Sequence, residues 1–276
     1  MVQLLFGTAG IPFSTQPPTT TDGIKRIASL GLGCMELEFV RGVYLNDDDA
    51  RLVAETATEY GVRLSAHAPY FINFNAHELK KLRASQGILL KTARIASLCG
   101  AGNLVFHAGF YLGDTPQDTY RTITKYLSEV LAQLNEEDIG INLRPEVSGK
   151  ASQFGTIAEL IGLCSELDGL APCIDFAHWH ARTGGFNSYT EFVSVLEQIR
   201  DELGQASLYD MHIHISGIAY GVKGEQRHLI LKESDLRYVE LLQALKDYDV
   251  SGSVICESPN LEEDALVLQR SYLALP

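Results

Sequence analysis

The chain has 276 residues, of which 46% are hydrophobic and 21% are charged, values that are ordinary for a globular enzyme. Its 35 acidic and 22 basic residues give a formal net charge of −13, which disfavours a nucleic-acid partner without excluding one, because such partners usually leave a basic footprint. No apolar run approaches the ~20 residues that span a bilayer, and the start MVQLLFGTAGIPF lacks the basic and apolar regions of a signal peptide, so we expect a cytoplasmic protein without a membrane partner.

Short, β-branched runs alternate along the sequence with longer amphipathic segments. The expected strands span residues 4–9, 35–40, 63–68, 103–108, 141–146, 172–177, 211–216 and 253–258. The expected helices span residues 22–31, 47–60, 77–99, 117–136, 156–166, 189–203, 235–247 and 261–274. Eight strands, each followed by a helix, predict an α/β fold, a (β/α)8 TIM barrel that occupies residues 1–276 as a single domain. An open doubly wound sheet is the alternative, but no GxGxxG fingerprint follows the first strand.

Histidines and carboxylates recur where the expected strands end. In chain order they are His67, His107, Glu146, Asp175, His178, His214 and Glu257. Because active sites of such barrels lie at the carboxyl ends of the strands, we expect these side chains to converge. Histidine and carboxylate are preferred ligands of hard-to-borderline divalent metals, so the pattern predicts a multinuclear metal site. His77, which begins a predicted helix, is expected at the surface.

The acidic residue Glu146 interrupts an otherwise buried strand. An unpaired buried carboxylate is costly, so Glu146 needs a cation, which could be a metal ion or the neighbouring Arg144. Because residues two apart on a strand point the same way, both side chains could reach the site. We favour a metal ion as the partner of Glu146.

Two segments contain several candidate residues each. Asp175 and His178 have the spacing D-x-x-H, in which the aspartate projects from the strand and the histidine turns back from the following loop. His180, beside the only tryptophan, is expected to contribute to packing or to contact substrate. His212 and His214 share one face of their strand. His214 is nearer the carboxyl end and is the better ligand, whereas His212 is expected one layer deeper in a supporting role.

Seven short motifs link the sequence to a known family. They are HAPY at 67–70, VFHAG at 105–109, ExxG at 146–149, CIDxxH at 173–178, HIH at 212–214, RH at 227–228 and ESP at 257–259. In this order they resemble endonuclease IV, the metal-dependent apurinic/apyrimidinic (AP) endonucleases of the xylose isomerase-like TIM barrel superfamily. The resemblance covers essentially the whole chain, from the first strand to the eighth.

The resemblance implies a site for two or three Zn²⁺ ions, with Mn²⁺ as an alternative. The implied ligands are His67, His107 and Glu146 for the first ion, Glu146, Asp175, His214 and Glu257 for the second, and His178 and His228 for the third. The family adds an aspartate to the third set, at the position where this chain has Gln226. We therefore expect a divergent member, in which Glu225 replaces that carboxylate or the third ion is weakly held or absent.

The activity implied by the resemblance is that of a zinc-dependent phosphodiesterase, which hydrolyses the DNA backbone 5′ to an abasic site in base-excision repair. Glu146 would position the attacking water, and Glu257 would orient it or accept its proton. The partner would be damaged double-stranded DNA, and no obligate protein partner is indicated.

The predicted DNA contacts lie in loops. An enzyme of this kind must draw the abasic nucleotide out of the duplex, and loop side chains fill the gap. Arg41, Tyr70 and Asn73 are the candidates for this role, while Lys223 and Arg227 are expected to contact phosphates.

A different enzyme class remains as the alternative. Single-metal sugar isomerases and epimerases share the barrel and use a metal core of Glu, Asp, His and Glu, here Glu146, Asp175, His214 and Glu257. Because an epimerase needs no further metal, His67, His107 and His228 favour the nuclease. A non-catalytic binding barrel is the third hypothesis, which so many buried ligand residues disfavour.

Overall fold

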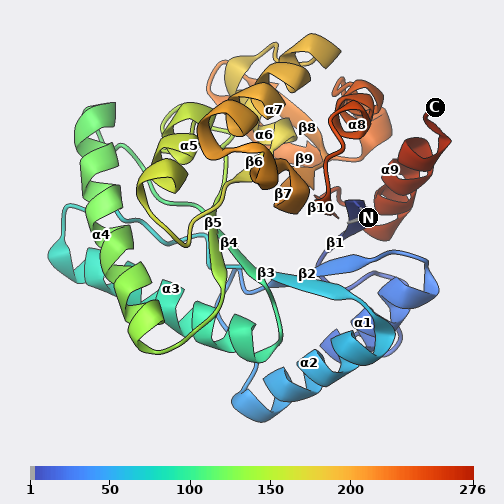
Figure 1. Ribbon diagram of the computed structural model, residues 1–276, viewed down its shortest axis with the longest axis horizontal. Coiled ribbons are helices and arrows are strands. Elements are labelled where there is room, and N and C mark those ends of the chain that lie inside the picture. The colour runs from blue at the N-terminus through green and yellow to red at the C-terminus, as the bar shows by residue number, and fades with distance from the viewer. Residues whose placement is uncertain (1–3) are drawn as a thin grey trace.

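The computed structural model describes residues 4–276 and confirms the predicted barrel (Figure 1). Its parallel strands are β1 Leu4–Ala9, β2 Cys34–Glu38, β3 Arg63–His67, β4 Asn103–Phe106, β5 Asn142–Pro145, β6 Cys173–Asp175, β7 Met211–Ile215 and β10 Gly252–Cys256. They pair in the order β5-β4-β3-β2-β1-β10-β7-β6. Backbone hydrogen bonds from Leu143 N to Gly169 O (3.1 Å) and from Val147 N to Cys173 O (3.1 Å) join β5 to β6 and close the ring.

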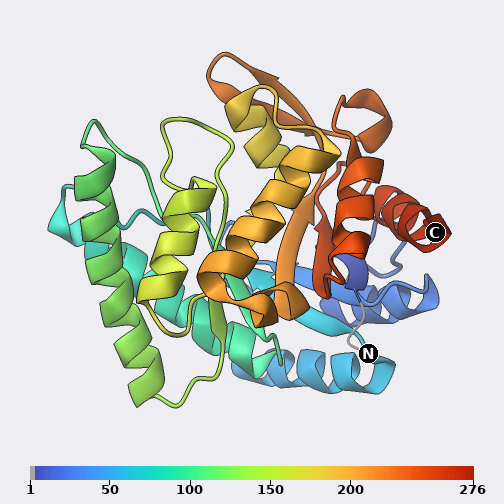
Figure 2. The same cartoon turned by 45° about the horizontal axis from the view of Figure 1, so that its top comes forward.

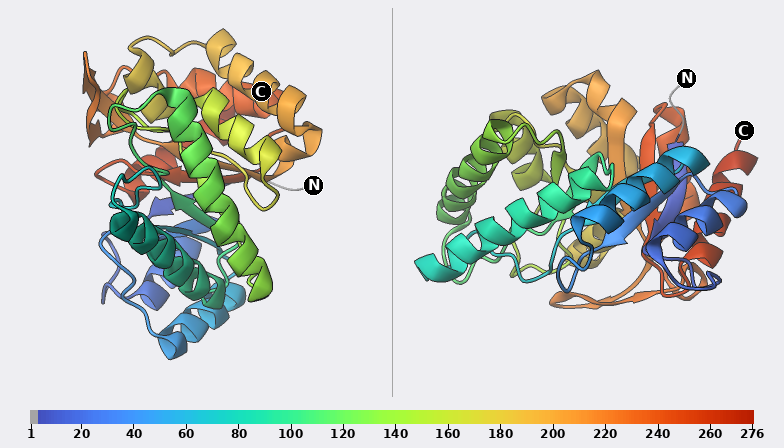
Figure 3. Two further views of the ribbon diagram at one scale, coloured as in Figure 1. Left: turned by 90° about the vertical axis from the view of Figure 1, so that its left-hand side faces the viewer. Right: turned by 90° about the horizontal axis from the view of Figure 1, so that it is seen from below.

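Helices cover the outside of the strands, as the additional views show (Figure 3). The predicted helices are α1 Thr20–Ser29, α2 Asp47–Tyr60, α3 Leu79–Leu98, α4 Pro116–Glu136, α5 Ile157–Glu166, α7 Tyr189–Leu203, α8 Tyr238–Asp247 and α9 Glu262–Ala274. The ends of α2 illustrate how local sequence sets these bounds. Asn46 caps its first turn by accepting a hydrogen bond from Asp49 N, and Gly61 ends it in the left-handed conformation at φ 66°. None of the helices in residues 4–276 combines the length and apolarity needed to cross a membrane.

Two elements that the sequence pattern predicts as loops are ordered at the carboxyl ends of the strands. The short helix α6, Phe176–Thr183, directly follows β6, and a hairpin of β8 Gly217–Gly221 and β9 Gly224–Leu229 follows β7. Figure 2 shows the orange hairpin at the top of the view, beyond the barrel strands. Each element is too short for its periodicity to stand out from a loop. The 3-10 turns Gln205–Asp210 and Leu231–Glu233 complete the connections.

The strands have a polar inner face and an apolar outer face. On β2, Met35 and Leu37 are buried in the apolar core, whereas Glu36 contacts Ser65 of β3 and His212 of β7 across the barrel interior. Side chains alternate along a strand, so the same register directs the ligand candidates inward. The barrel interior is therefore the part of the molecule in which a charged centre is assembled.

Candidate metal centre

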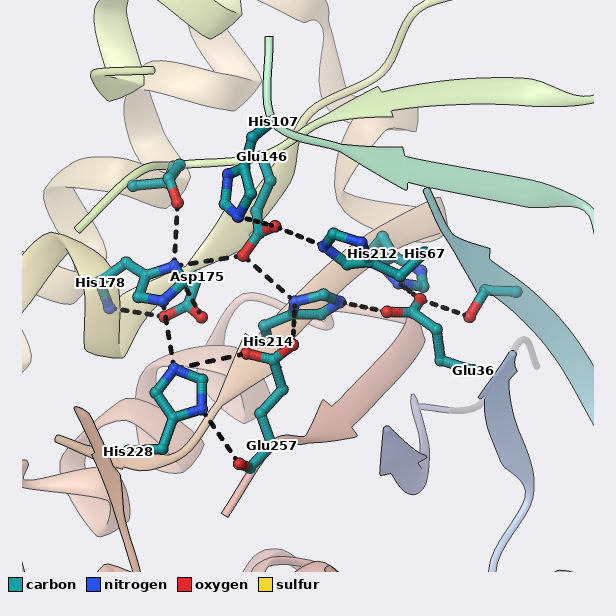
Figure 4. A network of polar contacts seen from close by, with 12 residues as sticks. Glu36, His67, His107, Glu146, Asp175, His178, His212, His214, His228 and Glu257 are labelled. Atoms are coloured by element: carbon teal, nitrogen blue, oxygen red, sulfur yellow. Dashed lines mark hydrogen bonds and ion pairs between the residues drawn. The ribbon is translucent and has the colours of Figure 1, made fainter. Parts of the chain in front are cut away.

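Glu146 lies in the middle of the centre, with its carboxylate facing four histidines (Figure 4). Glu146 Oε2 is 3.0 Å from His67 Nε2 and 3.2 Å from His107 Nε2. Glu146 Oε1 is 3.2 Å from His178 Nδ1 and 3.4 Å from His214 Nδ1. Only 1% of the Glu146 side chain is exposed, so these imidazoles replace water around its charge.

The structure brings together all eight residues predicted as metal ligands. Their side chains lie at the carboxyl ends of the strands, on α6 and on the hairpin. Four groups that contain the predicted ligands place their ligand atoms within 4.8 Å of one another, namely His67, His107 and Glu146; Glu146, Asp175, His178 and Glu257; His178, Glu225 and His228; and Glu36, His214 and Glu257. The first two groups share Glu146, which is the arrangement that a bridging carboxylate requires.

Buried oxygens in the centre fit a divalent cation. Glu146 Oε1, Asp175 Oδ2 and Glu257 Oε2 are buried and receive no well-aligned hydrogen bond from residues 4–276. A buried carboxylate oxygen without a donor is costly, and coordination of a cation removes that cost. Imidazole nitrogens together with carboxylate oxygens are donors that suit Zn²⁺, and carboxylates also suit Mn²⁺. The donor set present here therefore fits the predicted metals.

The carboxyl groups of the centre differ in their ionisation. Burial opposes the charge of Glu146, but the surrounding histidines hold its pKa well below the usual range. Burial also opposes the charge of Glu257, but His214 and His228 outweigh the effect of burial and lower the pKa of Glu257 to about 2. At Asp175 burial dominates and raises the pKa to about 7. The centre thus combines two ionised carboxylates with one carboxyl group that titrates near neutral pH.

Two histidines beside Glu146 titrate in opposite directions. Burial disfavours the charged form of His67, but its hydrogen bond to Glu146 and the charge of that carboxylate raise its pKa to about 9. Burial lowers the pKa of His107 to about 4. In the cation-free protein His67 therefore carries a proton at neutral pH, and a cation has to displace that proton in order to bind.

Glu36 is a residue of the centre that the sequence reasoning missed. It is fully buried, and its Oε2 accepts hydrogen bonds from Ser65 Oγ (2.7 Å) and His212 Nε2 (2.8 Å). Glu36 Oε1 is 3.0 Å from His214 Nε2, so it faces the nitrogen of His214 that points away from Glu146. A carboxylate in that position fixes the ring and leaves Nδ1 free for a metal. The signal was present in the strand MELEF, where Glu36 and Glu38 alternate with apolar residues.

Glu38 is the second missed acid, two residues nearer the rim than Glu36. It lies opposite His67 in the register of β2 and β3, and its Oε1 is buried. Burial raises the pKa of Glu38 to about 8. Glu38 is thus mostly neutral at pH 7, unlike Glu36, whose pKa stays well below the usual range because His214 and His212 outweigh burial.

Arg144 does not reach the centre, although its position two residues before Glu146 allowed it to do so. Its guanidinium donates to Asn103 Oδ1 (2.8 Å) and to Asp210 Oδ2 (2.6 Å), and Asp210 directly precedes the first residue of β7. The long side chain therefore extends toward the amino-terminal end of the barrel, while Glu146, two residues later, points to the carboxyl end. Sharing one face of a strand did not make the two residues neighbours.

His178 and His228 reach the centre from ordered elements rather than from loops. Asp175 caps α6 by accepting a hydrogen bond from His178 N (2.6 Å), so the helix rather than a flexible turn aims the imidazole. His228 lies on β9. Gln226 is exposed, and the carboxylate that accompanies the two histidines belongs to Glu225, with its Oε2 3.8 Å from His178 Nε2.

The remaining three histidines are not among the predicted metal ligands. His212 supports Glu36 from one layer below His214, as expected. His180 pairs with Asp235 (3.0 Å), and its ring packs edge-on against Tyr220. His77 is exposed and pairs with Asp114 (2.7 Å), in agreement with the predicted surface position.

Comparison with known proteins identifies the family. A family model described as "Xylose isomerase-like TIM barrel" matches residues 24–273. The chain belongs to the xylose isomerase-like TIM barrel family. This confirms the superfamily that the sequence motifs indicated.

Relatives of this xylose isomerase-like protein include members named as nucleases. It is 46% identical over 272 residues to an uncharacterised protein of Methanocaldococcus jannaschii, an alignment that covers 98% of this chain and 97% of the relative. It is 27% identical over 218 residues to a probable endonuclease 4 of Staphylococcus carnosus, which covers 76% of this chain and 71% of the relative.

Solved structures with the same fold include both enzyme classes considered above. A D-tagatose 3-epimerase-like protein superposes with a TM-score of 0.75 at 20% identity, over 98% of this chain and 97% of the other. Endonuclease IV from Thermus thermophilus superposes with a TM-score of 0.73 at 17% identity, over 98% of each chain. At these identities the likeness concerns the fold alone, and the residues of the site have to distinguish the activities.

A cavity of about 460 Å³ opens above the centre of this xylose isomerase-like barrel. Of the predicted DNA contacts, only Tyr70 lines it; its ring lies 5.2 Å from that of His67, and the side chain is 54% exposed. Lys150 and Gln153, from the segment after β5, also line the cavity and were not predicted. Lys150 is the one cationic side chain among the cavity-lining residues other than histidine.

The other predicted DNA contacts lie outside this cavity. Arg41, Lys223 and Arg227 are exposed in the connections at the carboxyl ends of the strands. Asn73 has a role within the protein, because its Oδ1 accepts hydrogen bonds from Asn75 N (3.0 Å) and Phe110 N (3.3 Å). It thereby joins the loop after β3 to the loop after β4.

Proposed function

We propose that this protein is a metal-dependent AP endonuclease, which hydrolyses the DNA phosphodiester 5′ to an abasic site. The observation that carries the proposal is the pair His67 and His107, both placed on Glu146 Oε2 at 3.0 and 3.2 Å. A single-metal core needs neither histidine. A carboxylate with imidazoles on both of its oxygens is instead suited to bridging two cations.

The proposed ligands are those that converge in the structure. They are His67, His107, Glu146, Asp175, His178, His214, His228 and Glu257. Zn²⁺, with Mn²⁺ as an alternative, would neutralise the negative charge of the phosphate oxygens and lower the pKa of the attacking water. Glu146 holds the imidazoles in place and would position the water, and Glu257, ionised with a pKa of about 2, would orient that water or accept its proton.

The proposed substrate is damaged double-stranded DNA, with the abasic sugar in the cavity above the centre. Tyr70 forms part of the cavity wall and can cover the extruded sugar, while Lys150 can contact a phosphate oxygen. Arg41, Lys223 and Arg227, exposed around the carboxyl ends of the strands, would contact the backbone of the duplex. The similarity to a probable endonuclease 4 supports this substrate, and a cytoplasmic location is part of the proposal.

A single-metal sugar epimerase is the second candidate function, and one observation favours it. Asp175 and Glu257 belong to the same cluster, yet burial raises the pKa of Asp175 to about 7 while the pKa of Glu257 is about 2. Two carboxyl groups with pKa values pushed apart are what an acid and base pair requires. The epimerase structures with the same fold are in agreement with this alternative.

Substitution of His67 distinguishes the two functions. Purified protein loaded with Zn²⁺ or Mn²⁺ should nick a duplex that contains one abasic site, with the product ending in a 3′-hydroxyl. His67→Ala should abolish nicking, whereas His77→Ala, which removes an exposed histidine outside the centre, should leave it unchanged. The nuclease proposal is wrong if the wild-type protein leaves abasic DNA intact and epimerises a ketose, and if the His67→Ala variant retains that epimerase activity.

A further inference from the structure

The hairpin beside the centre contains an irregularity at Gln226. Ala219 pairs with Arg227 and Tyr220 pairs with Glu225, so Gln226 falls between two consecutive pairs as an extra residue, the definition of a β-bulge. Gln226 is exposed, whereas Glu225 and His228 on either side of the bulge are half-buried. The bulge therefore separates an outward-facing amide from two inward-facing ligand candidates.

The bulge changes which side chains share a face. Glu225 and His228 are three residues apart, and on a regular strand they would point to opposite sides. Because the bulge absorbs one residue, both side chains turn toward the barrel, and each lies in the cluster with His178. A carboxylate at position 226 would instead project into solvent, at the place where the Gln226 amide now lies.

Close docking holds the hairpin in this position. Glu225 N donates to Gly149 O (2.9 Å), and Lys150 forms an isolated bridge with Gly224. A Cβ on Gly149 would lie 2.7 Å from Glu225 Cβ and 2.8 Å from Glu225 Oε2. A Cβ on Gly224, where φ is 92°, would lie 2.2 Å from Gly149 O. Two glycines are thus required for the hairpin to approach the segment after β5.

Both imidazoles in the cluster present the same ring nitrogen to the gap between them. His178 Nδ1 lies 3.1 Å from Val147 O, and His228 Nδ1 lies 3.1 Å from Glu257 O. A nitrogen that faces a carbonyl oxygen carries the proton, which leaves the lone pair on Nε2. The two Nε2 atoms are 3.3 Å apart, and Glu225 Oε2 is 3.8 Å from His178 Nε2. Two nitrogen lone pairs and one carboxylate oxygen therefore face a common point.

We propose that His178, His228 and Glu225 bind one divalent cation of the Zn²⁺ class, and that the β-bulge at Gln226 is the device that supplies its carboxylate. The inference deepens the proposed function, because it provides the third cation position with the carboxylate that residue 226 lacks. Of the two outcomes expected from the sequence for the third ion, it selects replacement of the missing carboxylate by Glu225. Two histidines and one acid form the donor set found in many zinc sites that keep a position open for water or substrate.

Zinc stoichiometry tests the assignment without any activity measurement. Protein stripped with a chelator, reloaded with Zn²⁺ and dialysed would be assayed for zinc per chain by mass spectrometry. Glu225→Gln should hold one ion fewer than wild type, or bind that ion at least about 100-fold more weakly. Loss of a residue that only supports a metal ligand already reduces metal affinity about 10–100-fold. Gln226→Asp should match wild type. Crystals soaked in Zn²⁺ should show anomalous scattering between His178, Glu225 and His228, and the peak should be missing in Glu225→Gln.

Asp235→Asn is the matched control. Asp235 pairs with His180 (3.0 Å) and with Tyr220 of the hairpin (2.7 Å), but lies outside the cluster, so its neutralisation should leave the zinc content unchanged. In the presence of a chelator, Glu225→Gln should unfold at the wild-type temperature, because the side chain is partly exposed. An unchanged zinc content in Glu225→Gln, or an additional ion in Gln226→Asp, would overturn the inference. A protein that binds this ion through Glu225 but does not nick abasic DNA would refute only the proposed function.

Discussion

The inner and outer parts of the centre are built in different ways. The inner part, Glu36, His212 and His214, lies on barrel strands, and each of its residues is fully buried. The outer part, His178, Glu225 and His228, lies on α6 and on the hairpin, with 19% of the Glu225 side chain and 26% of the His228 side chain exposed. Glu146 connects the two parts through His214 and His178.

This difference indicates where the centre is rigid. Strand positions are fixed by the hydrogen-bonded register of the barrel, so the inner side chains cannot move without disturbing the sheet. The outer side chains depend on the docking of two short elements. We therefore expect perturbations of the inner part and of Glu146 to affect every bound ion, and perturbations of the outer part to affect one.

The largest effect is expected at Glu146, which belongs to both parts. Glu146→Gln retains the volume of the side chain but removes the charge that four histidines face. Nicking of abasic DNA should fall by about 10³-fold or more, within the range for loss of an acid–base group. The assay is the initial rate at saturating metal. A rate within tenfold of wild type in a folded Glu146→Gln protein would contradict the central position of Glu146.

Glu36→Gln tests the inner part. The amide can still face His212 and His214, but it lacks the charge that fixes the His214 ring, so the affinity for Zn²⁺ should fall about 10–100-fold. Chelator competition measures this. Asp210→Asn, which weakens the contact of the half-exposed Asp210 with the buried Arg144 at the other end of the barrel, is the control for a general loss of stability. Equal losses in both variants would show that Glu36 acts through the fold alone.

The dependence of zinc affinity on pH should come mainly from His67, which contacts Glu146. His67, with a pKa of about 9, must release its proton when a cation binds, so affinity should rise with pH between 7 and 9 and level off above. One released proton corresponds to about tenfold in affinity per pH unit. Titration of Zn²⁺ in weakly buffered solution measures the proton release. An affinity that is flat over this range would mean that His67 is not a ligand or is already neutral.

The smallest effect is expected at the rim of the outer part. Lys223 and Arg227 are exposed on the hairpin and would each contact one phosphate. Replacement of either by alanine should reduce the slope of log affinity against log salt by about 1, measured between about 50 and 200 mM salt. Lys125→Ala, on the outer helix α4, should leave the slope unchanged. Binding of abasic duplex that does not depend on salt would remove DNA from consideration as the substrate.

The sequence by itself determined the barrel and the strand ends at which most residues of the centre lie. The spacing of strands and helices predicted the eight parallel strands, because most of these elements are long enough to show the periodicity of apolar residues that is typical of a strand or a helix. Polar residues at strand ends, such as His67 and Glu257, were correctly expected at the carboxyl ends of the strands, because a parallel barrel gathers those ends at one rim. Glu36 was missed although its strand alternates acids with apolar residues, since an acid in a strand interior is normally excluded by the cost of burial.

The tertiary structure decided the outer part. Arg144 lies on β5 and Glu146 directly follows that strand, but the two side chains extend to opposite ends of the barrel, where Arg144 contacts Asp210 and Glu146 contacts the histidines. The position of Glu225 depends on a bulge in β9 and on the contact between Gly149 and Gly224. A bulge is a mismatch between two paired strands, so it depends on both strands. The contact between Gly149 and Gly224 joins segments about 75 residues apart, because connections between parallel strands are long. Neither feature is a property of any local stretch of sequence, so only the packed chain determines which acid faces the histidines.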